Sequence, residues 1–83
     1  MRLTDGHEMT IQEELDTTGL LCPLPVLKAA KKLRSMPAGA VLKVMADDPA
    51  GLVDFPHFCS EQGHELVATH EREGAQIYVI RKA

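Results

Sequence analysis

The sequence contains no tryptophan and few aromatic residues of any kind, with one tyrosine and two phenylalanines in 83 residues. Proteins that bind single-stranded nucleic acid stack bases on several aromatic side chains, and this chain has too few for such a platform. Its formal net charge is −3, whereas binding to phosphates needs a concentrated excess of lysine and arginine. We therefore expect no direct nucleic-acid partner.

Long apolar segments and cysteines are also scarce. No run of apolar residues is long enough to span a bilayer, and residues 1–6 lack the apolar region of a secretory signal. The two cysteines are too few for a disulfide scaffold or a four-cysteine zinc site. These absences predict a cytoplasmic protein with reduced cysteines and no membrane partner.

The polar residues do not predict a metal site or a cofactor. The candidate ligands His57, Cys59 and His64 are scattered without tight spacing. Asp47 and Asp48 resemble a pair of acid catalysts, but the cap of a helix explains them better, because Pro49 follows them directly. We therefore expect neither a resident metal nor a cofactor.

The length and the 45% hydrophobic content suffice for a single small core. Residues 1–8 are polar and unpatterned, which predicts a flexible tail followed by one domain over residues 9–83. Apolar alternation, helical periodicity and turn residues predict the order β-α-β-α-β-β. The expected strands cover residues 9–15, 40–46, 64–70 and 75–82, and the expected helices cover residues 26–36 and about 49–62.

Two consequences follow for the fold. Right-handed crossovers between parallel strands would place both helices on one face of a mixed four-stranded sheet, which is a two-layer α/β sandwich. The other face of the sheet would stay open, and its apolar side chains form a candidate partner surface. Pro56 is expected to interrupt the second helix near Asp54 and Phe55, because proline removes a helical hydrogen bond.

The most informative motif is Cys22-Pro23-Leu24-Pro25, which places a thiol where the first helix is expected to begin. Proline suits the first helical position because it lacks a backbone N–H and its φ is already helical. Cys22 is therefore predicted to be the N-cap residue, with unpaired backbone N–H groups directed at its sulfur. Such a position lowers the pKa of a thiol and favours the reactive thiolate. The alternative is that Cys22 is a small buried apolar residue.

Basic residues cluster on the same helix. Lys28, Lys31 and Lys32 fall on the side away from its apolar stripe, with Arg34 nearby. A positive field raises association rates with anions, so this face is a candidate docking patch for an acidic protein surface or an anionic sulfur species. The alternative is an ordinary solvated helix face.

The sequence resembles the TusA/SirA-like family of small sulfur-carrier proteins over residues 15–82. The segments that carry the resemblance are Leu15–Pro25, Ala46–Ala50, His64–Ala68 and Tyr78–Lys82. The resemblance implies a two-layer α/β sandwich in which the cysteine of the C-P-x-P motif, Cys22, carries sulfur as a persulfide, with Pro23 and Pro25 supporting it. It also implies a cysteine desulfurase or rhodanese-like donor and a downstream relay protein, in tRNA 2-thiolation, molybdenum-cofactor assembly or another sulfur-transfer pathway.

The motif departs from the tRNA-thiolation branch at two positions. That branch typically has arginine before the cysteine and an acidic residue between the prolines, where this chain has Leu21 and Leu24. These apolar residues leave the thiol chemistry intact and change the surface that a partner meets. We therefore expect Leu21, Leu24, Lys28 and Lys31 to contact partners.

The leading hypothesis is a sulfur carrier that resembles a sulfurtransferase rather than a conventional turnover enzyme. One alternative is a thiol redox or regulatory module that uses Cys22 without carrying sulfur, and another is an interaction module built on the open sheet face. Cys59 is either a second reactive thiol or a packed helical cysteine, and the helical pattern around Phe58 favours packing.

Overall fold

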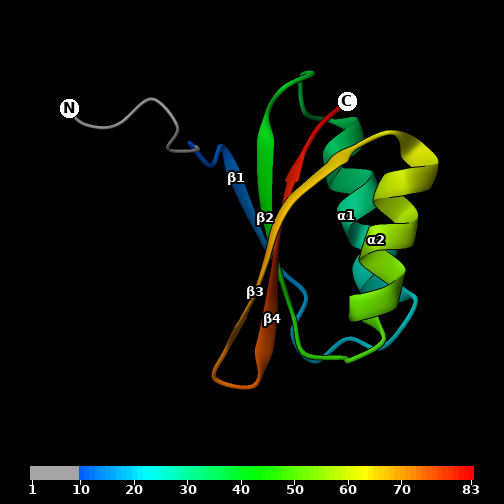
Figure 1. Ribbon diagram of the computed structural model, residues 1–83, viewed down its shortest axis with the longest axis vertical. Helices are drawn as coiled ribbons and strands as arrows, with labels where there is room; N and C mark the ends of the chain where they lie inside the picture. The colour runs from blue at the N-terminus through cyan, green and yellow to red at the C-terminus, as the bar shows by residue number, and fades with distance from the viewer. Residues whose placement is uncertain (1–9) are drawn as a thin grey trace.

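Four strands and two helices follow one another in the predicted order in the computed structural model (Figure 1), which describes residues 10–83. The predicted tail over residues 1–8 lies outside the described residues, as does Met9. The elements are β1 (Glu13–Asp16), α1 (Leu24–Arg34), β2 (Val41–Ala46), α2 (Gly51–Gln62), β3 (Glu65–Arg72) and β4 (Ala75–Arg81).

The strands form one mixed sheet in the order β1-β2-β4-β3. Strand β1 is parallel to β2, and β4 runs antiparallel to both of its neighbours. Helices α1 and α2 lie side by side on one face of this sheet (Figure 1). The predicted two-layer α/β sandwich is therefore confirmed, and the parallel pairing of β1 and β2 brings the loops that follow them to the same edge.

The core lies between the helices and the face of the sheet that they cover. Strand alternation places Leu42 and Val44 on this face, opposite Ile80 and Tyr78 in the neighbouring strand, and all four are fully buried. The ring of Phe55 on α2 stacks on Tyr78 with 4.3 Å between the ring centroids. The remaining buried apolar members of this cluster are Ala29, Leu33, Met36, Ala40, Ala46 and Cys59.

Two strand boundaries differ from the prediction. Strand β1 begins at Glu13 rather than Met9. Just before it, the backbone N–H of Gln12 donates to the carbonyl of Val41, and the N–H of Val41 donates to Gln12 Oε1. The final hairpin has a two-residue turn, Glu73-Gly74, in place of the predicted four-residue turn. Both turn residues have positive φ, 53° and 83°, and this left-handed conformation matches the twist of paired strands, so the strands extend further.

The predicted interruption of α2 is wrong, because the helix is continuous across Pro56. Pro56 is exposed and lies in the second helical turn, where its ring removes the hydrogen bond that a backbone N–H would make to Leu52. Phe55 and Cys59 on the inner face are buried in the core. Their burial supports the helix on both sides of the proline.

The predicted cap of α2 is also wrong. Ala50 is the N-cap residue, and within the described part of the chain no side chain caps the helix. Backbone bonds serve instead: the N–H groups of Gly51 and Leu52 donate to the carbonyls of Asp48 and Pro49, each at 3.0 Å. These turns satisfy N–H groups that a helix start otherwise leaves unpaired, while Asp48 Oδ1 accepts the N–H of Ala50 at 3.0 Å and Asp48 Oδ2 binds the cysteine loop.

Candidate functional site

Cys22 is an exposed free thiol in the loop between β1 and α1. It is not the N-cap residue, contrary to the prediction, because Pro23 occupies that position and the helix begins at Leu24. The N–H of Leu24 donates to the carbonyl of Leu21 at 2.8 Å, and the N–H of Leu27 donates to that of Pro23 at 3.1 Å. Cys22 thus lies just before α1.

The predicted supports Pro23 and Pro25 occupy different environments. Pro23 is exposed at the N-cap, whereas Pro25 is buried in the first turn of α1 together with Ala29 and Leu33 on the inner face. Proline is tolerated there because the N–H groups of the first turn have no helical partner. Burial of Pro25 anchors the start of the helix to the core and leaves the preceding thiol at the surface.

Two aspartates of the β2–α2 turn hold the cysteine loop. The backbone N–H of Cys22 donates to Asp48 Oδ2 at 2.7 Å, and the N–H of Gly19 donates to Asp47 Oδ1 at 3.0 Å. The loop is further fixed by buried Thr17, whose hydroxyl donates to the carbonyl of Met45 at 2.6 Å. The sequence-based prediction missed this role of Asp47 and Asp48. The signal that could have revealed it is the parallel pairing of β1 and β2, because the loops that follow two parallel strands meet at the same edge of the sheet.

A surface hollow of about 210 Å³ opens beside the thiol. On one side it is lined by Cys22, Pro23 and Val26. On the other side it is lined by one face of α2, namely Asp54, His57, Phe58 and Glu61. His57 Nε2 lies 3.4 Å from Glu61 Oε1 one turn further along the helix. The hollow combines an apolar floor with polar groups close to a sulfur atom.

The electrostatics of Cys22 are opposite to the sequence-based expectation. Hydrogen bonding with the Asp54 side chain, some desolvation and the charges of Asp54 and Asp48 raise the pKa of the Cys22 thiol above its ordinary value. A neighbouring anion disfavours a thiolate. The carboxylates of Asp54 and Asp48 therefore oppose ionisation of this thiol, contrary to the effect expected from the dipole of α1.

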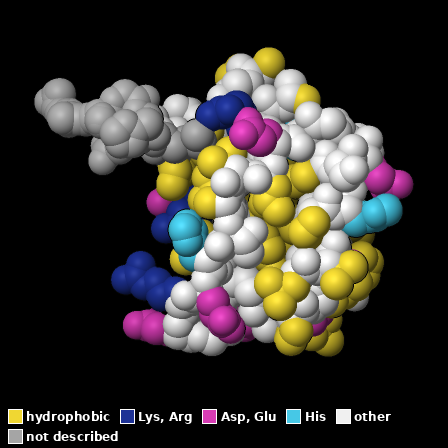
Figure 2. Space-filling view, viewed as in Figure 1, with side chains coloured by type: hydrophobic (Ala, Val, Ile, Leu, Met, Phe, Trp, Pro, Cys, Tyr) yellow, Lys and Arg dark blue, Asp and Glu magenta, His cyan; other side chains and the backbone are white. Residues whose placement is uncertain are grey.

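Exposed apolar side chains occur at the N-terminal ends of both helices, the end of the molecule that carries Cys22. Leu21 and Leu24 flank it in the chain and are 70% and 46% exposed, while Leu52 and Val53 at the start of α2 are 52% and 72% exposed. Figure 2 shows hydrophobic side chains gathered over the end of the helical layer where both helices begin. We call Leu21, Leu24, Leu52 and Val53 the apolar rim. Leu21 and Leu24, two of the predicted partner contacts, are thus accessible.

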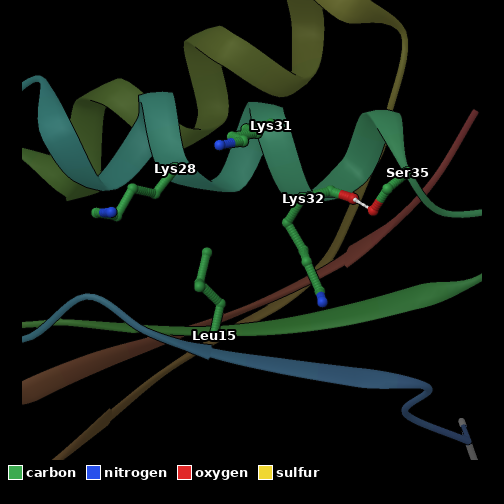
Figure 3. Close-up of a pocket in the computed structure, with 5 residues that line it drawn as sticks. All are labelled: Leu15, Lys28, Lys31, Lys32 and Ser35. Carbon is green, nitrogen blue, oxygen red and sulfur yellow. Dashed lines mark hydrogen bonds between the residues drawn. The ribbon is translucent and has the colours of Figure 1, made fainter.

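The lysines of α1 lie on a different surface, the side that faces β1. Lys28, Lys31 and Lys32 line a groove of about 280 Å³ together with Leu15 and Ser35. In Figure 3, Leu15 projects from β1 toward α1, and Lys32 extends toward β1, where its Nζ lies 3.1 Å from Glu13 Oε1. Lys28 and Lys31 are exposed and form no ion pair within residues 10–83. We call Lys28 and Lys31 the basic face.

Cys59 is buried in the core, which agrees with the packed role that its helical position favoured. The other two candidate metal ligands are not gathered around it: His57 contacts Glu61, and His64 Nδ1 accepts the N–H of Ala83 at 3.0 Å. Within the described part of the chain, no group of three histidine, cysteine, aspartate or glutamate side chains is placed to hold a metal ion. Over the same residues, no helix has the length and apolar character needed to cross a membrane.

The two thiols are expected to react at very different rates. Burial raises the pKa of Cys59 to about 11, so at pH 8 only about one part in a thousand would be thiolate even without steric protection. In the folded protein, iodoacetamide should therefore modify Cys22 long before Cys59, as peptide mass spectrometry would show. Equal modification of both cysteines without denaturant would contradict the packing described here.

Comparison with known proteins assigns most of this chain to one group. The family model for sulfurtransferase TusA matches residues 13–82. The sulfur carrier protein TusA of Pseudomonas syringae pv. syringae is 50% identical over 76 residues, which cover 92% of this chain and 90% of that protein. The sulfur carrier protein TusA of Allochromatium vinosum is 44% identical over 71 residues, 86% of this chain and 93% of that protein.

A solved structure shows the same architecture. The SirA-like protein of Desulfitobacterium hafniense superposes with a TM-score of 0.74 at 25% sequence identity, over 83% of this chain and 95% of that one. The likeness supports the two-layer α/β architecture described above.

Proposed function

The chain belongs to the sulfurtransferase TusA family, and we propose that it acts as a sulfur carrier with Cys22 as the residue that holds sulfane sulfur as a persulfide. The observation that supports this role most strongly is the contrast between its two cysteines. Cys22 is exposed beside a hollow on a loop fixed by hydrogen bonds, whereas Cys59 is enclosed in the core. The test is whether persulfide forms on Cys22 and not on Cys59.

Sulfur uptake on Cys22 is a thiol exchange reaction. The sulfur of Cys22, as a thiolate, attacks the terminal sulfur of a donor persulfide, and the bond between the two donor sulfurs breaks. The electron pair of that bond stays on the donor, which leaves as a thiolate and takes up a proton. The carrier gains one sulfur atom without net oxidation, and a later acceptor thiolate removes this sulfur in the same way.

This chemistry requires an accessible sulfur on a rigid support and surfaces that two successive partners recognise. The donor we propose is a cysteine desulfurase or a rhodanese-like protein, and the acceptor is the next protein of a tRNA 2-thiolation, molybdenum-cofactor or other sulfur-transfer pathway. The apolar rim around Cys22 offers these partners contact area close to the sulfur. We place the relay in the cytoplasm, because a reducing compartment keeps free thiols available.

The basic face offers a second contact that acts at longer range. Lys28 lies one helical turn from Leu24, so a partner seated over the apolar rim would also approach these charges. Neither lysine is neutralised by an ion pair within the described residues. An acidic donor surface would therefore be steered toward Cys22 by the uncompensated positive charge.

Reversing the basic face is expected to slow sulfur uptake. The double substitution Lys28→Glu and Lys31→Glu should reduce the rate of loading from an acidic donor about tenfold at low salt, because electrostatic steering raises association rates by at least that factor. The effect should shrink as salt is added, since screening acts over about 8 Å at physiological ionic strength. Stopped-flow loading kinetics across a salt series would measure it.

A matched control reverses two charges elsewhere. Lys43→Glu with Arg72→Glu changes the net charge by the same amount at a second surface depression, which includes neither the lysines of α1 nor Cys22. This control should load at the rate of the unmodified protein. Equal slowing of both double variants, or unchanged kinetics for the Lys28 and Lys31 variant at low salt with each donor tested, would remove the basic face from the docking surface.

A further inference from the structure

The hollow beside Cys22 places a histidine across from the carrier thiol. Cys22 and Pro23 line it at the start of α1, and His57 lines it from α2. The hollow measures about 210 Å³, whereas a water molecule in the liquid takes up about 30 Å³. One water molecule, or a sulfur atom under transfer, therefore fits between the thiol and the imidazole ring.

A carboxylate orients this histidine. His57 Nε2 lies 3.4 Å from Glu61 Oε1 on the next turn of α2, and Nδ1 has no hydrogen-bond partner among residues 10–83. An anion beside an imidazole favours its protonated form and fixes the direction of the ring. Nδ1 is thus available to a group in the hollow, and thiol, imidazole and carboxylate are arranged in the order that activates nucleophiles in enzymes.

The other side chains of this hollow are poorly suited to exchange protons at neutral pH. Val26 and Phe58 are apolar, and Asp54 carries a carboxyl group, which is ordinarily ionised at neutral pH. An imidazole ordinarily gains and loses a proton between pH 5 and 8. Three lysines of α1 line the separate groove that faces β1. Among the described residues that line the hollow, His57 is therefore the natural acid and base.

We propose that His57, held by Glu61, is the acid–base residue of sulfur exchange at Cys22. This inference rests on the proposed role of Cys22 as the carrier residue. The need for a base follows from the carboxylates of Asp54 and Asp48, which oppose ionisation of the thiol. A thiol that stays protonated needs a base within reach, either directly or through one water molecule.

The proton and the electron pairs balance in both directions of the exchange. In uptake, neutral His57 takes the proton of the Cys22 thiol. The sulfur then attacks the terminal sulfur of the donor persulfide, the donor S–S bond breaks, and its electron pair leaves with the donor thiolate, which receives the proton from His57. In release, an acceptor thiolate attacks the outer sulfur, and protonated His57 gives its proton to Cys22 Sγ as the S–S bond breaks. Neither direction needs an added oxidant or reductant.

The substitution His57→Ala is expected to slow sulfur uptake about a hundredfold at pH 7, because general acid–base catalysis contributes at least about that factor. The His57 side chain is 71% exposed, so thermal unfolding should be unchanged. Stopped-flow uptake from glutathione persulfide measures the rate without a protein donor. Added imidazole should restore much of the lost rate in His57→Ala, because the free base can occupy the space of the missing ring.

Two further variants separate acid–base chemistry from a general effect of histidine or charge. His70→Ala is the matched control, because His70 is an exposed histidine on β3 that lines a different depression, and it should keep the rate of the unmodified protein. Uptake needs neutral His57, so its rate should rise with pH as the imidazolium loses its proton. Glu61→Gln should shift this rise to lower pH, because the imidazolium loses the neighbouring anion.

Uptake by His57→Ala at the unmodified rate would overturn the proposal, as would a slowed variant that imidazole does not accelerate. Failure of the proposed carrier function has a different signature, since the unmodified protein would then take up no sulfur on Cys22. Alkylation of Cys22 by iodoacetamide at pH 7 tests His57 without any sulfur transfer, and it should be slower in His57→Ala because the thiolate loses the imidazolium beside it. Equal alkylation rates would remove His57 from the thiol chemistry.

Discussion

Replacing Cys22 with serine is expected to abolish sulfur transfer through this protein. Serine keeps the size and exposure of the side chain, but its hydroxyl cannot form a persulfide, so the exchange reaction has no attacking sulfur. The assay is transfer of labelled sulfur from a cysteine desulfurase supplied with cysteine. Because Cys22 is exposed and contributes nothing to the core, thermal unfolding of Cys22→Ser should match that of the unmodified protein.

Cys59→Ser is the matched control for this loss. It also removes one thiol, yet it should retain sulfur transfer, because Cys59 is buried and its pKa is raised to about 11. It should lose some stability, since a hydroxyl without a partner in an apolar core costs about 1–3 kcal/mol. Transfer by Cys22→Ser, or loss of transfer in a folded Cys59→Ser, would reverse the roles given to the two cysteines.

Replacing Gly51 with alanine is expected to destabilise the fold next to the carrier loop. A Cβ at this position would lie 2.8 Å from the hydroxyl oxygen of Tyr78 and 3.3 Å from Phe55. The Tyr78 ring is fully buried and stacked on Phe55, so it cannot move away easily. Overpacking of this kind costs about 1–3 kcal/mol, and the better helix propensity of alanine offsets at most about 1 kcal/mol.

Tyr78→Phe separates this clash from other effects of the substitution. The Tyr78 hydroxyl is buried and has no hydrogen-bond partner among residues 10–83, so removing it should be nearly neutral or slightly stabilising. In the Tyr78→Phe background, Gly51→Ala should lose most of its cost, because the closest contact disappears. Urea denaturation of the unmodified protein, the two single variants and the double variant gives the coupling free energy between the two positions. If the two losses in free energy of unfolding are additive, the Tyr78 hydroxyl is not the reason that position 51 requires glycine.

The sequence predicts the architecture well because its signals are local and repeated. Alternation in β2 and β4 places Val44 and Tyr78 on the covered face, and the glycine of the Glu73-Gly74 turn marks the final hairpin. Pro56 was misjudged because a local rule competes with burial of the neighbouring Phe55 and Cys59, and burial prevails. Packing of this kind becomes visible only when the elements are assembled.

The sequence located an exposed thiol near the start of α1 but did not predict the charges around it. The C-P-x-P motif correctly placed Cys22 at the surface near the start of α1. The expected fall in its pKa depended on capping, which the position of Pro23 prevents. The groups that set the pKa, Asp54 and Asp48, come from a distant part of the sequence and meet the thiol only through the parallel pairing of β1 and β2 and the packing of α2 on α1.

The most direct measurement of the central claim is peptide mass spectrometry of the carrier after incubation with a cysteine desulfurase and cysteine. We predict an increase of about 32 Da, one sulfur atom, on the peptide that contains Cys22, which dithiothreitol removes. The peptide that contains Cys59 should be unchanged. An adduct on Cys59 alone, or a mixed disulfide between Cys22 and the donor without any added sulfur, would contradict the account, and the latter would identify a thiol redox module.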